Sequence, residues 1–308
     1  MKIYQSLYDF IPSKKTVLTL GTFDGVHKGH QKIITELVET ARDKGCESLI
    51  LTFFPHPRMV LQEPSEIKLL NTIEEKSELL AQLGVNHLII HPFDQTFSRL
   101  SAEEFVSDIL VKQLALEKII IGYDHRFGRN RTADIHDLME YGEEFGFEVQ
   151  QISALEIDSI SVSSTKIRTA LQEGDVEKAN EYLGHPYFLS GKVIKGKSIG
   201  RTIGFPTANL HIEESYKLIP KNGVYVVQTY INEKRLFGMM NIGFNPTFEG
   251  SSQSIEIHLF DFEGDLYHQN LKIELLKRIR DEVKFDSMEA LQEQLVLDKN
   301  QTLQYLKL

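Results

Sequence analysis

Strand-like and helix-like patterns of apolar residues alternate along the first 183 positions of the chain. Short apolar runs typical of buried strands cover residues 16–20, 48–53, 87–90, 118–121 and 147–152. Helical signals lie between them, over residues 31–44, 74–83 and 133–145 and at a Ser-x-x-Glu capping box over residues 101–104. Because strands that alternate with helices form parallel sheets, this part is predicted to be a doubly wound α/β domain. Ligands of such sheets bind beyond the carboxyl ends of the strands.

From about Tyr187 the pattern changes to strands without intervening helices. Apolar runs cover residues 187–194, 223–230, 235–242, 254–260 and 271–279, with turn-rich pieces between them. This arrangement favours an antiparallel barrel or sandwich. A helical pattern over residues 287–297 closes the chain, with Leu291 and Leu295 on one face. The boundary is predicted near residues 184–186, which gives domains of residues 1–183 and 184–308.

Composition limits the classes of function. A chain of 308 residues can form two domains, and its net charge of −10 at pH 7 argues against a nucleic-acid surface, which needs a basic stripe. One cysteine, Cys46, permits no internal disulfide, as is typical of a reducing compartment. No apolar run approaches the roughly 18 residues of a membrane span. We therefore expect a cytoplasmic protein with no membrane, nucleic-acid or obligate protein partner.

A glycine-rich turn between the first predicted strand and helix carries candidate chemistry. It reads Gly-Thr-Phe-Asp-Gly-Val-His-Lys-Gly-His over residues 21–30. Its small residues let backbone N–H groups approach a ligand, and the start of the next helix favours an anion. His27 and His30 can donate hydrogen bonds to phosphate oxygens as charge builds up during transfer. A polyphosphate site is therefore predicted; the alternative is a tight turn with two solvated histidines.

Two further loops follow predicted strands. Residues 52–58 read Thr-Phe-Phe-Pro-His-Pro-Arg, in which the prolines hold His56 and Arg58 in a defined direction. The two phenylalanines form a stacking surface, or one of them packs in the core. Residues 122–131 place three arginines in a glycine-flanked loop, for which a solvated basic loop is the alternative.

A third segment, residues 161–168, opens a helix with Ser-Val-Ser-Ser-Thr-Lys-Ile-Arg. Ser163 or Ser164 can cap this helix. Hydroxyls and exposed N–H groups, with a cation one turn further on, make a phosphate clamp. A well-capped helix without a ligand is the alternative interpretation.

The second domain contains a misleading motif. Residues 191–198 match the P-loop pattern letter for letter. A P-loop needs a strand before it and a helix after it, but the sequence continues with glycine, proline and β-branched residues. We therefore expect no P-loop here.

Residues 204–209, Gly-Phe-Pro-Thr-Ala-Asn, carry more information. Alternation in an extended segment directs Thr207 and Asn209 to the same side. Neutral oxygens of this kind suit Mg²⁺ that is shared with nucleotide phosphates; a strand entered after a proline turn is the alternative. Glu256, between Ile255 and Ile257, faces away from both in an alternating strand, where a carboxylate is usually solvated.

Taken in order, these motifs resemble a known family. The histidine turn is similar to the signature of the nucleotidyltransferase superfamily, in the form found in bacterial FAD synthetases, and the Pro-Thr-Ala-Asn segment resembles riboflavin kinases. From end to end the chain resembles the bifunctional riboflavin kinase/FAD synthetases of bacteria. The resemblance implies a Rossmann-like nucleotidyltransferase domain, then an antiparallel riboflavin-kinase β-barrel with a terminal helix. It also implies ATP-dependent conversion of riboflavin to FMN and of FMN to FAD, with Mg²⁺.

The same resemblance assigns residues in the first domain. The α-phosphate of ATP is stabilised by His27 and His30, with FMN itself as the nucleophile. The other nucleotide-binding residues are Gly21, Phe23, Asp24, Gly29, Ser164, Thr165 and Arg168. The flavin-binding residues are Phe54, His56, Pro57, Arg58, Asp124 and Arg126.

In the second domain, the resemblance makes Glu256 the general base that accepts the proton of the ribityl 5′-hydroxyl. The nucleotide-binding residues are Gly196, Lys197, Gly200, Gly204, Thr207 and Asn209, the last two also binding Mg²⁺. Arg280 and Phe285 border the flavin. Two other interpretations stay open: a related adenylyltransferase with another substrate, such as a pantetheine phosphate, and a flavin-binding regulatory protein that keeps the fold.

Overall fold

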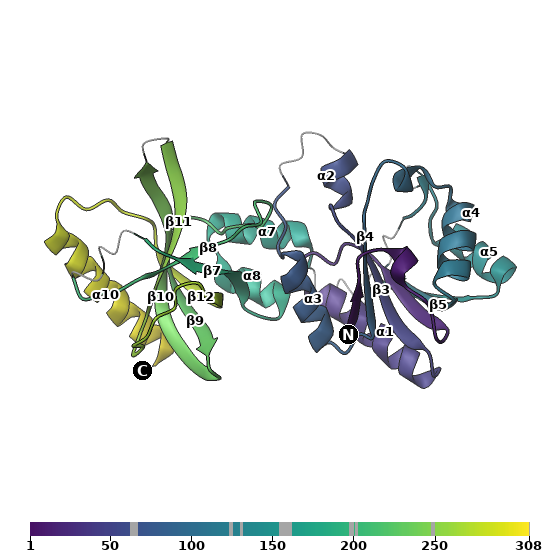
Figure 1. Ribbon diagram of the computed structural model, residues 1–308, viewed down its shortest axis with the longest axis horizontal. Helices are drawn as coiled ribbons and strands as arrows, with labels where there is room; N and C mark the ends of the chain where they lie inside the picture. The colour runs from purple at the N-terminus through teal and green to yellow at the C-terminus, as the bar shows by residue number, and fades with distance from the viewer. Residues whose placement is uncertain are drawn as a thin grey trace. The chain divides into compact units, whose positions relative to one another are not determined.

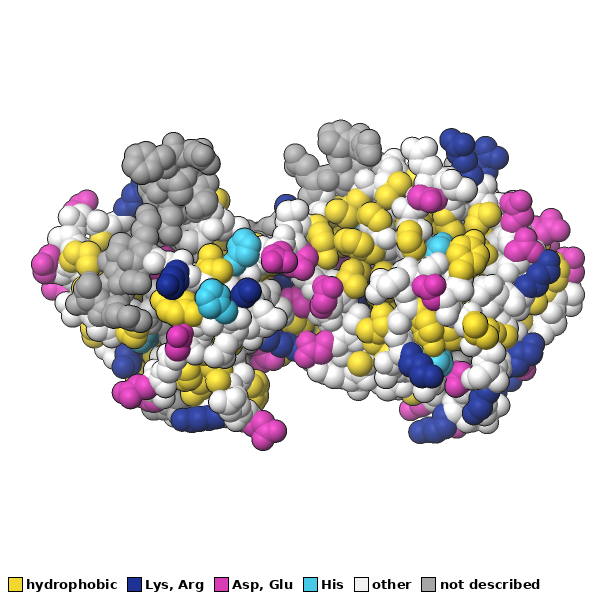
Figure 2. Space-filling model, in the orientation of Figure 1, with side chains coloured by type: hydrophobic (Ala, Val, Ile, Leu, Met, Phe, Trp, Pro, Cys, Tyr) yellow, Lys and Arg dark blue, Asp and Glu magenta, His cyan; other side chains and the backbone are white. Residues whose placement is uncertain are grey.

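The chain forms two units, Met1–Ser164 and Thr165–Leu308, in a computed structural model (Figure 1). The structure describes residues 1–61, 67–122, 126–129, 132–153, 162–196, 200, 203–247 and 250–307. Among these, no helix is both long and apolar enough to cross a membrane. Acidic and basic side chains are interspersed on the face shown in Figure 2.

A six-stranded parallel sheet forms the centre of the first unit, in the order β1-β4-β3-β2-β5-β6. Its strands are β1 (Lys2–Tyr4), β2 (Thr16–Leu20), β3 (Glu47–Phe53), β4 (His87–His91), β5 (Leu116–Gly122) and β6 (Glu148–Ile152). After β2, the chain adds β3 and β4 on one side of β2. It then crosses over and adds β5 and β6 on the other side. The direction of winding therefore reverses at β2, and ligands of doubly wound sheets bind at such a point. The turn at residues 21–30 leaves the carboxyl end of β2.

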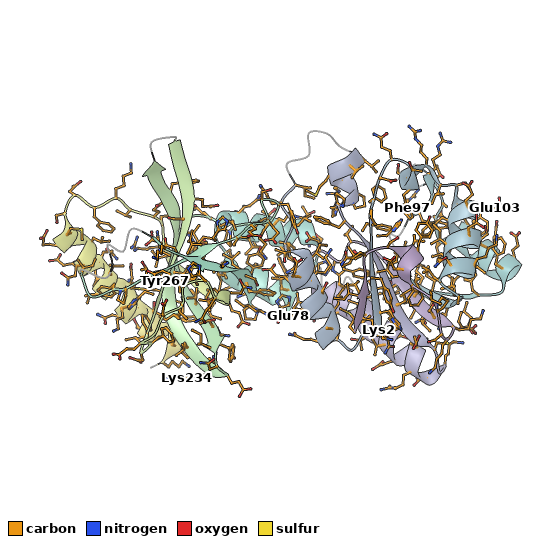
Figure 3. All side chains as sticks on the ribbon, in the orientation of Figure 1. Lys2, Glu78, Phe97, Glu103, Lys234 and Tyr267 are labelled. Atoms are coloured by element: carbon orange, nitrogen blue, oxygen red, sulfur yellow. The ribbon has the colours of Figure 1, made fainter. Side chains whose placement is uncertain are left out.

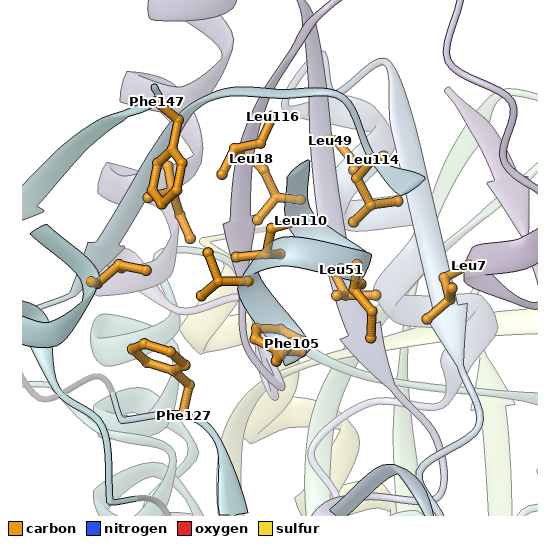
Figure 4. Packing of buried hydrophobic residues seen from close by; sticks show 14 of the residues in the cluster. Leu7, Leu18, Leu49, Leu51, Phe105, Leu110, Leu114, Leu116, Phe127 and Phe147 are labelled. Atoms are coloured by element: carbon orange, nitrogen blue, oxygen red, sulfur yellow. The ribbon is translucent and has the colours of Figure 1, made fainter. Parts of the chain in front are cut away.

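Helices flank this sheet. They are α1 (Lys28–Asp43), α2 (Pro57–Leu61), α3 (Ile73–Gln82), α4 (Ala102–Glu104), a π-helical segment (Phe105–Gln113) and α5 (Ile135–Phe145). The predicted capping box is confirmed, since Ser101 and Glu104 exchange both of its hydrogen bonds. Leu18 and Leu51 of the sheet pack with Phe105 and Leu110 of the π-helical segment (Figure 4). Burying each of these side chains contributes about 1.5–3 kcal/mol.

The edge strand β1 is not predicted by the sequence pattern. Its three residues are too few to show alternation, and Lys2 and Ile3 are exposed. The strand forms because Lys2–Tyr4 pairs in parallel with the buried residues 87–89 of β4.

Six antiparallel strands close into a barrel in the second unit, in the order β10-β11-β8-β7-β12-β9. They are β7 (Tyr187–Ile194), β8 (Ala208–His211), β9 (Gly223–Ile231), β10 (Lys234–Thr247), β11 (Gly250–Leu259) and β12 (Asn270–Arg280). Lys234, labelled in Figure 3, begins β10 after a two-residue turn in which Asn232 and Glu233 both have positive φ. Such a turn matches the twist of a hairpin. The predicted antiparallel barrel is confirmed.

Helices α7 (Ser164–Glu173), α8 (Val176–Leu183) and α10 (Met288–Leu306) are described in the second part of the chain. The side chain of Asn180 in α8 donates to Leu275 O and accepts from Tyr187 N, which ties α8 to two barrel strands. Helix α10 extends nine residues beyond the predicted end at residue 297. The apolar pattern does not show this extension, because the fully buried residues there, Asp298 and Thr302, are polar. Residues 191–194 of the P-loop match lie inside β7.

Candidate active sites

The turn between β2 and α1 has an unusual backbone. Phe23, Gly25 and Val26 have φ angles of 46°, 88° and 41°. Left-handed φ angles cost free energy for Phe and Val, and such strain is concentrated at functional sites. The turn therefore holds a shape that the sequence does not favour locally.

His27 and His30 lie side by side at the start of α1. His27 is the N-cap, and its Nδ1 accepts a 3.3 Å hydrogen bond from His30 N. A ring nitrogen that accepts from a backbone N–H carries no proton, so the proton of neutral His27 is on Nε2. The two rings stack with centroids 3.6 Å apart and planes 14° apart. Nδ1 of His30 is buried and has no hydrogen-bond partner among the described residues.

Burial keeps both imidazoles neutral near pH 7. It lowers the pKa of His27 to about 4, although a backbone hydrogen bond opposes the shift. The pKa of His30 lies well below its usual value because of burial first, and then because of repulsion from His27 when that ring is protonated and from the ammonium group of Lys76. A neutral imidazole keeps one ring N–H, which can donate a hydrogen bond to a phosphate oxygen. This is the chemistry that the predicted polyphosphate site requires.

The other turn residues predicted to bind nucleotide point inward. Phe23 and Asp24 are at most 3% exposed. The Phe23 ring lies edge-on to His30, at 5.2 Å between centroids. Asp24 Oδ1 accepts hydrogen bonds from the backbone N–H groups of Leu70 and Asn71. Gly21, whose N–H donates to Leu51 O, and the buried Gly29 complete the set.

The predicted phosphate clamp begins at the first residue of α7. Ser164 Oγ donates a 2.9 Å hydrogen bond to Asp24 O, so this hydroxyl contacts the turn that leads to the histidines. Thr165 and Arg168 follow in α7 and belong to the second unit. Their role at the phosphates stays a prediction.

The residues predicted on the flavin side follow two strands: Phe54, His56, Pro57 and Arg58 come after β3, and Asp124 and Arg126 come after β5. His56 is buried and its Nδ1 accepts from Arg58 N at 3.1 Å, while Pro57 begins α2. Phe53 packs against the core and lies edge-on to Phe93, and both Phe53 and Phe54 are half-buried. Arg126 is exposed, and Asp124 lies outside the described residues.

In the barrel, three predicted residues come together from β8 and β11. Thr207, immediately before β8, donates from Oγ1 to Glu256 Oε2 at 3.2 Å. Asn209 lies directly opposite Glu256 in the antiparallel register. Thr207 and Asn209 therefore share one side of the strand, beside the carboxylate. These oxygens suit Mg²⁺ shared with a nucleotide, and the described residues hold no group of three His, Cys, Asp or Glu side chains that could bind a metal alone.

Glycines bring the preceding loop close to these side chains. A methyl group on Gly196 would overlap the Asn209 amide, and one on Gly200 would overlap Phe205 O. Gly204 has a φ of +84°, which favours glycine. A side chain at Gly196 or Gly200 would therefore force these neighbours to move. Lys197 lies outside the described residues.

Arg280 and Phe285, predicted to border the flavin, lie together at the end of β12. The Arg280 guanidinium is 5.8 Å from the Phe285 ring centroid. It also donates to both carboxylate oxygens of Asp298 at 2.9 and 2.7 Å, which ties β12 to α10. This bidentate pair fixes the plane of the guanidinium beside Phe285.

Sequence reasoning missed the polar residues Asp298 of α10 and His258 of β11. Asp298 is fully buried by its pairing with Arg280, and no local pattern shows such a pair. His258 lies two residues beyond Glu256, hence on the same face of β11, and its Nδ1 is 2.8 Å from Pro206 O. The two-residue spacing from Glu256 in an alternating strand indicates this shared face from the sequence alone.

Comparisons with known proteins identify the family. A family model for FAD synthetase matches residues 11–166, and one for riboflavin kinase matches residues 183–306. The chain belongs to the family of bifunctional riboflavin kinase/FMN adenylyltransferases. The resemblance drawn from the motifs is thereby confirmed.

Relatives of this family match over nearly their whole length. The bifunctional riboflavin kinase/FMN adenylyltransferase of Listeria monocytogenes is 41% identical, covering 93% of this chain and 91% of the relative. That of Escherichia coli K12 is 36% identical, covering 97% and 96%. A crystal structure from Streptococcus pneumoniae, named a macrolide-efflux protein, has a TM-score of 0.88 at 33% identity and covers 98% of both chains. The last comparison supports the fold of the entire chain.

Proposed function

We propose that this chain forms FMN in its barrel and FAD at the turn between β2 and α1. ATP is the co-substrate of both steps, and FMN and FAD are the products. The stacked, neutral pair of His27 and His30 at the switch point of the sheet is the observation that carries the assignment of the FAD site. The family matches, residues 11–166 and 183–306, support a functional boundary near residue 184.

In the adenylyl transfer, a phosphate oxygen of FMN attacks the α-phosphorus of ATP. The new P–O bond forms as the bond to the departing pyrophosphate breaks, so no side chain needs to act as nucleophile. Negative charge develops on the non-bridging oxygens of the α-phosphate. Nε2–H of His27 and an N–H of His30 stabilise this charge by hydrogen bonding. Ser164, Thr165 and Arg168 hold the β- and γ-phosphates.

In the kinase step, the 5′-hydroxyl of riboflavin attacks the γ-phosphorus of ATP, and ADP leaves. Glu256 accepts the proton of this hydroxyl as the general base. The Thr207 hydroxyl, which donates to Glu256 Oε2, fixes the orientation of the carboxylate. We assign Mg²⁺ to Thr207 and Asn209, where the ion supplies charge neutralisation of the nucleotide phosphates. Arg280 and Phe285 border the flavin.

A time course tests both activities at once. The purified chain is incubated with riboflavin, ATP and Mg²⁺, and the flavins are separated chromatographically. FMN is expected first and FAD after it. FMN alone, also when reduced flavin is supplied, would contradict the FAD site. No product from either flavin would favour a binding protein, and full activity with EDTA would contradict the Mg²⁺ assignment.

A further inference from the structure

A buried lysine outside all the recognised motifs contacts the turn that carries the two histidines. Lys76 in α3 is 3% exposed, although lysines are almost never fully buried unless they are paired. Two residues further on, Glu78 is exposed on the same helix (Figure 3). Lys76 Nζ donates a 2.7 Å hydrogen bond to Thr22 O, in the turn between β2 and α1. The ammonium group is therefore directed at the backbone of the FAD site.

Several hydrogen bonds connect this turn to residues 70–76, which lead into α3 and form its first turn. Besides the Lys76 bond, Asp24 Oδ1 accepts from Leu70 N at 2.9 Å and from Asn71 N at 3.4 Å. The start of α3 is itself held by a capping box between Thr72 and Glu75. Residues 70–76 thus form a hydrogen-bonded support for the strained backbone of the turn.

The charges of this support also act on the histidines. Burial lowers the pKa of Lys76, whereas the nearby Asp24 carboxylate raises it and so stabilises the ammonium form. The charge of Lys76 adds to burial and to His27 in lowering the pKa of His30. An ammonium group at this position therefore favours the neutral form of His30.

We propose that Lys76 is a positioning residue of the FAD-forming site, which holds the turn in the geometry that His27 and His30 need for adenylyl transfer. This inference rests on the proposed role of the two histidines at the α-phosphate. Lys76 acts through the Thr22 carbonyl and through its charge, without touching the substrate.

Replacing Lys76 by Met in the full-length chain removes the donor and the charge but retains a stem of similar length. We expect kcat for FAD formation from FMN and ATP to fall at least tenfold, while KM for FMN stays within about threefold. FMN formation by the same chain serves as an internal control and is expected to stay within twofold. Lys112→Met, at an exposed lysine of the same unit, should change neither rate. FAD formation within twofold of the unsubstituted chain overturns the proposal.

Two further measurements separate a positioning role from a loss of folding and from a failure of the site assignment. In Lys76→Ala, added ethylammonium should restore FAD formation at least threefold, whereas ethanol at the same concentration should not. Absence of amine rescue overturns the proposal even if Lys76→Met is unstable. The parallel variant His30→Ala tests the site itself: if it makes FAD normally, the assignment of the histidines fails whatever Lys76 does.

Discussion

The imidazole rings of His27 and His30 stack with their centroids 3.6 Å apart. Two imidazolium ions at this distance would repel each other strongly, and burial disfavours even one. The pair is therefore kept neutral by its surroundings. At pH values just below the usual histidine pKa, the rings stay neutral only in the folded chain, so the stability of the first unit depends on pH there. Because the rings are neutral, they act on a phosphate by donating hydrogen bonds.

The first unit should lose stability as the pH falls from about 6.5 to 4. The pKa of His27 is lowered to about 4 in the folded chain, so between these values the unfolded chain binds the proton more tightly. The free energy of unfolding is expected to fall by about 3 kcal/mol for His27 alone. Urea unfolding at several pH values gives the slope of the free energy of unfolding against pH. In His27→Gln, which keeps an acceptor for the N-cap, the slope should be smaller; an identical slope would exclude His27 as its source.

Removing the imidazole of His30 should separate the two activities. We expect His30→Ala to reduce FAD formation at least tenfold, which corresponds to about 1.4 kcal/mol of transition-state stabilisation. FMN formation should be spared, because the riboflavin kinase match begins at residue 183 and we assign this step to the barrel. Assays of each step with its own substrate provide the measurement. Near-normal FAD synthesis would remove His30 from the site.

Glu256→Gln should have the opposite selectivity. The amide keeps an acceptor oxygen for the Thr207 hydroxyl but cannot take up the proton of the ribityl hydroxyl. FMN formation is expected to fall about 100-fold, within the usual range for loss of a general base. FAD formation from supplied FMN serves as the matched control and should not change. Unchanged kinase turnover would rule out the general-base role.

The pair of Arg280 and Asp298 should contribute strongly to the stability of the second unit. Asp298 is fully buried, and Asp298→Asn leaves the Arg280 guanidinium without its carboxylate partner. Breaking a buried pair in this way costs about 3 kcal/mol or more, to be measured by urea unfolding. Asp286→Asn, at an exposed aspartate nearby, is the control. Equal stability of the two variants would mean that the pair contributes little.

Local patterns in the sequence predicted most elements of the fold. The strand before the histidine turn, the helix after it and the five apolar runs of the barrel are present within a few residues of their predicted bounds. Local periodicity determines these features, because alternation and helical spacing follow from how side chains leave the backbone. The side shared by Thr207 and Asn209 was predictable for the same reason.

Features that depend on distant partners were not predictable in this way. The edge strand β1 forms by pairing with β4, and the second half of α10 buries Asp298 only because Arg280 reaches it from β12. Lysine side chains are mostly exposed, yet Lys76 is buried against Thr22, 54 residues away in the sequence. Long-range contacts decide each of these cases.

By itself, the sequence determined the chemistry that this protein carries: two histidines in a glycine-rich turn, and hydroxyl, amide and carboxylate oxygens in an alternating barrel segment. It did so because motif residues are close in sequence and their spacing sets which side they face. Only the tertiary structure decided that the histidines are stacked and neutral, that Asp24 turns inward, and that Glu256 lies opposite Asn209. Burial and strand register are properties of the assembled chain, since they depend on which distant segments exclude water and pair.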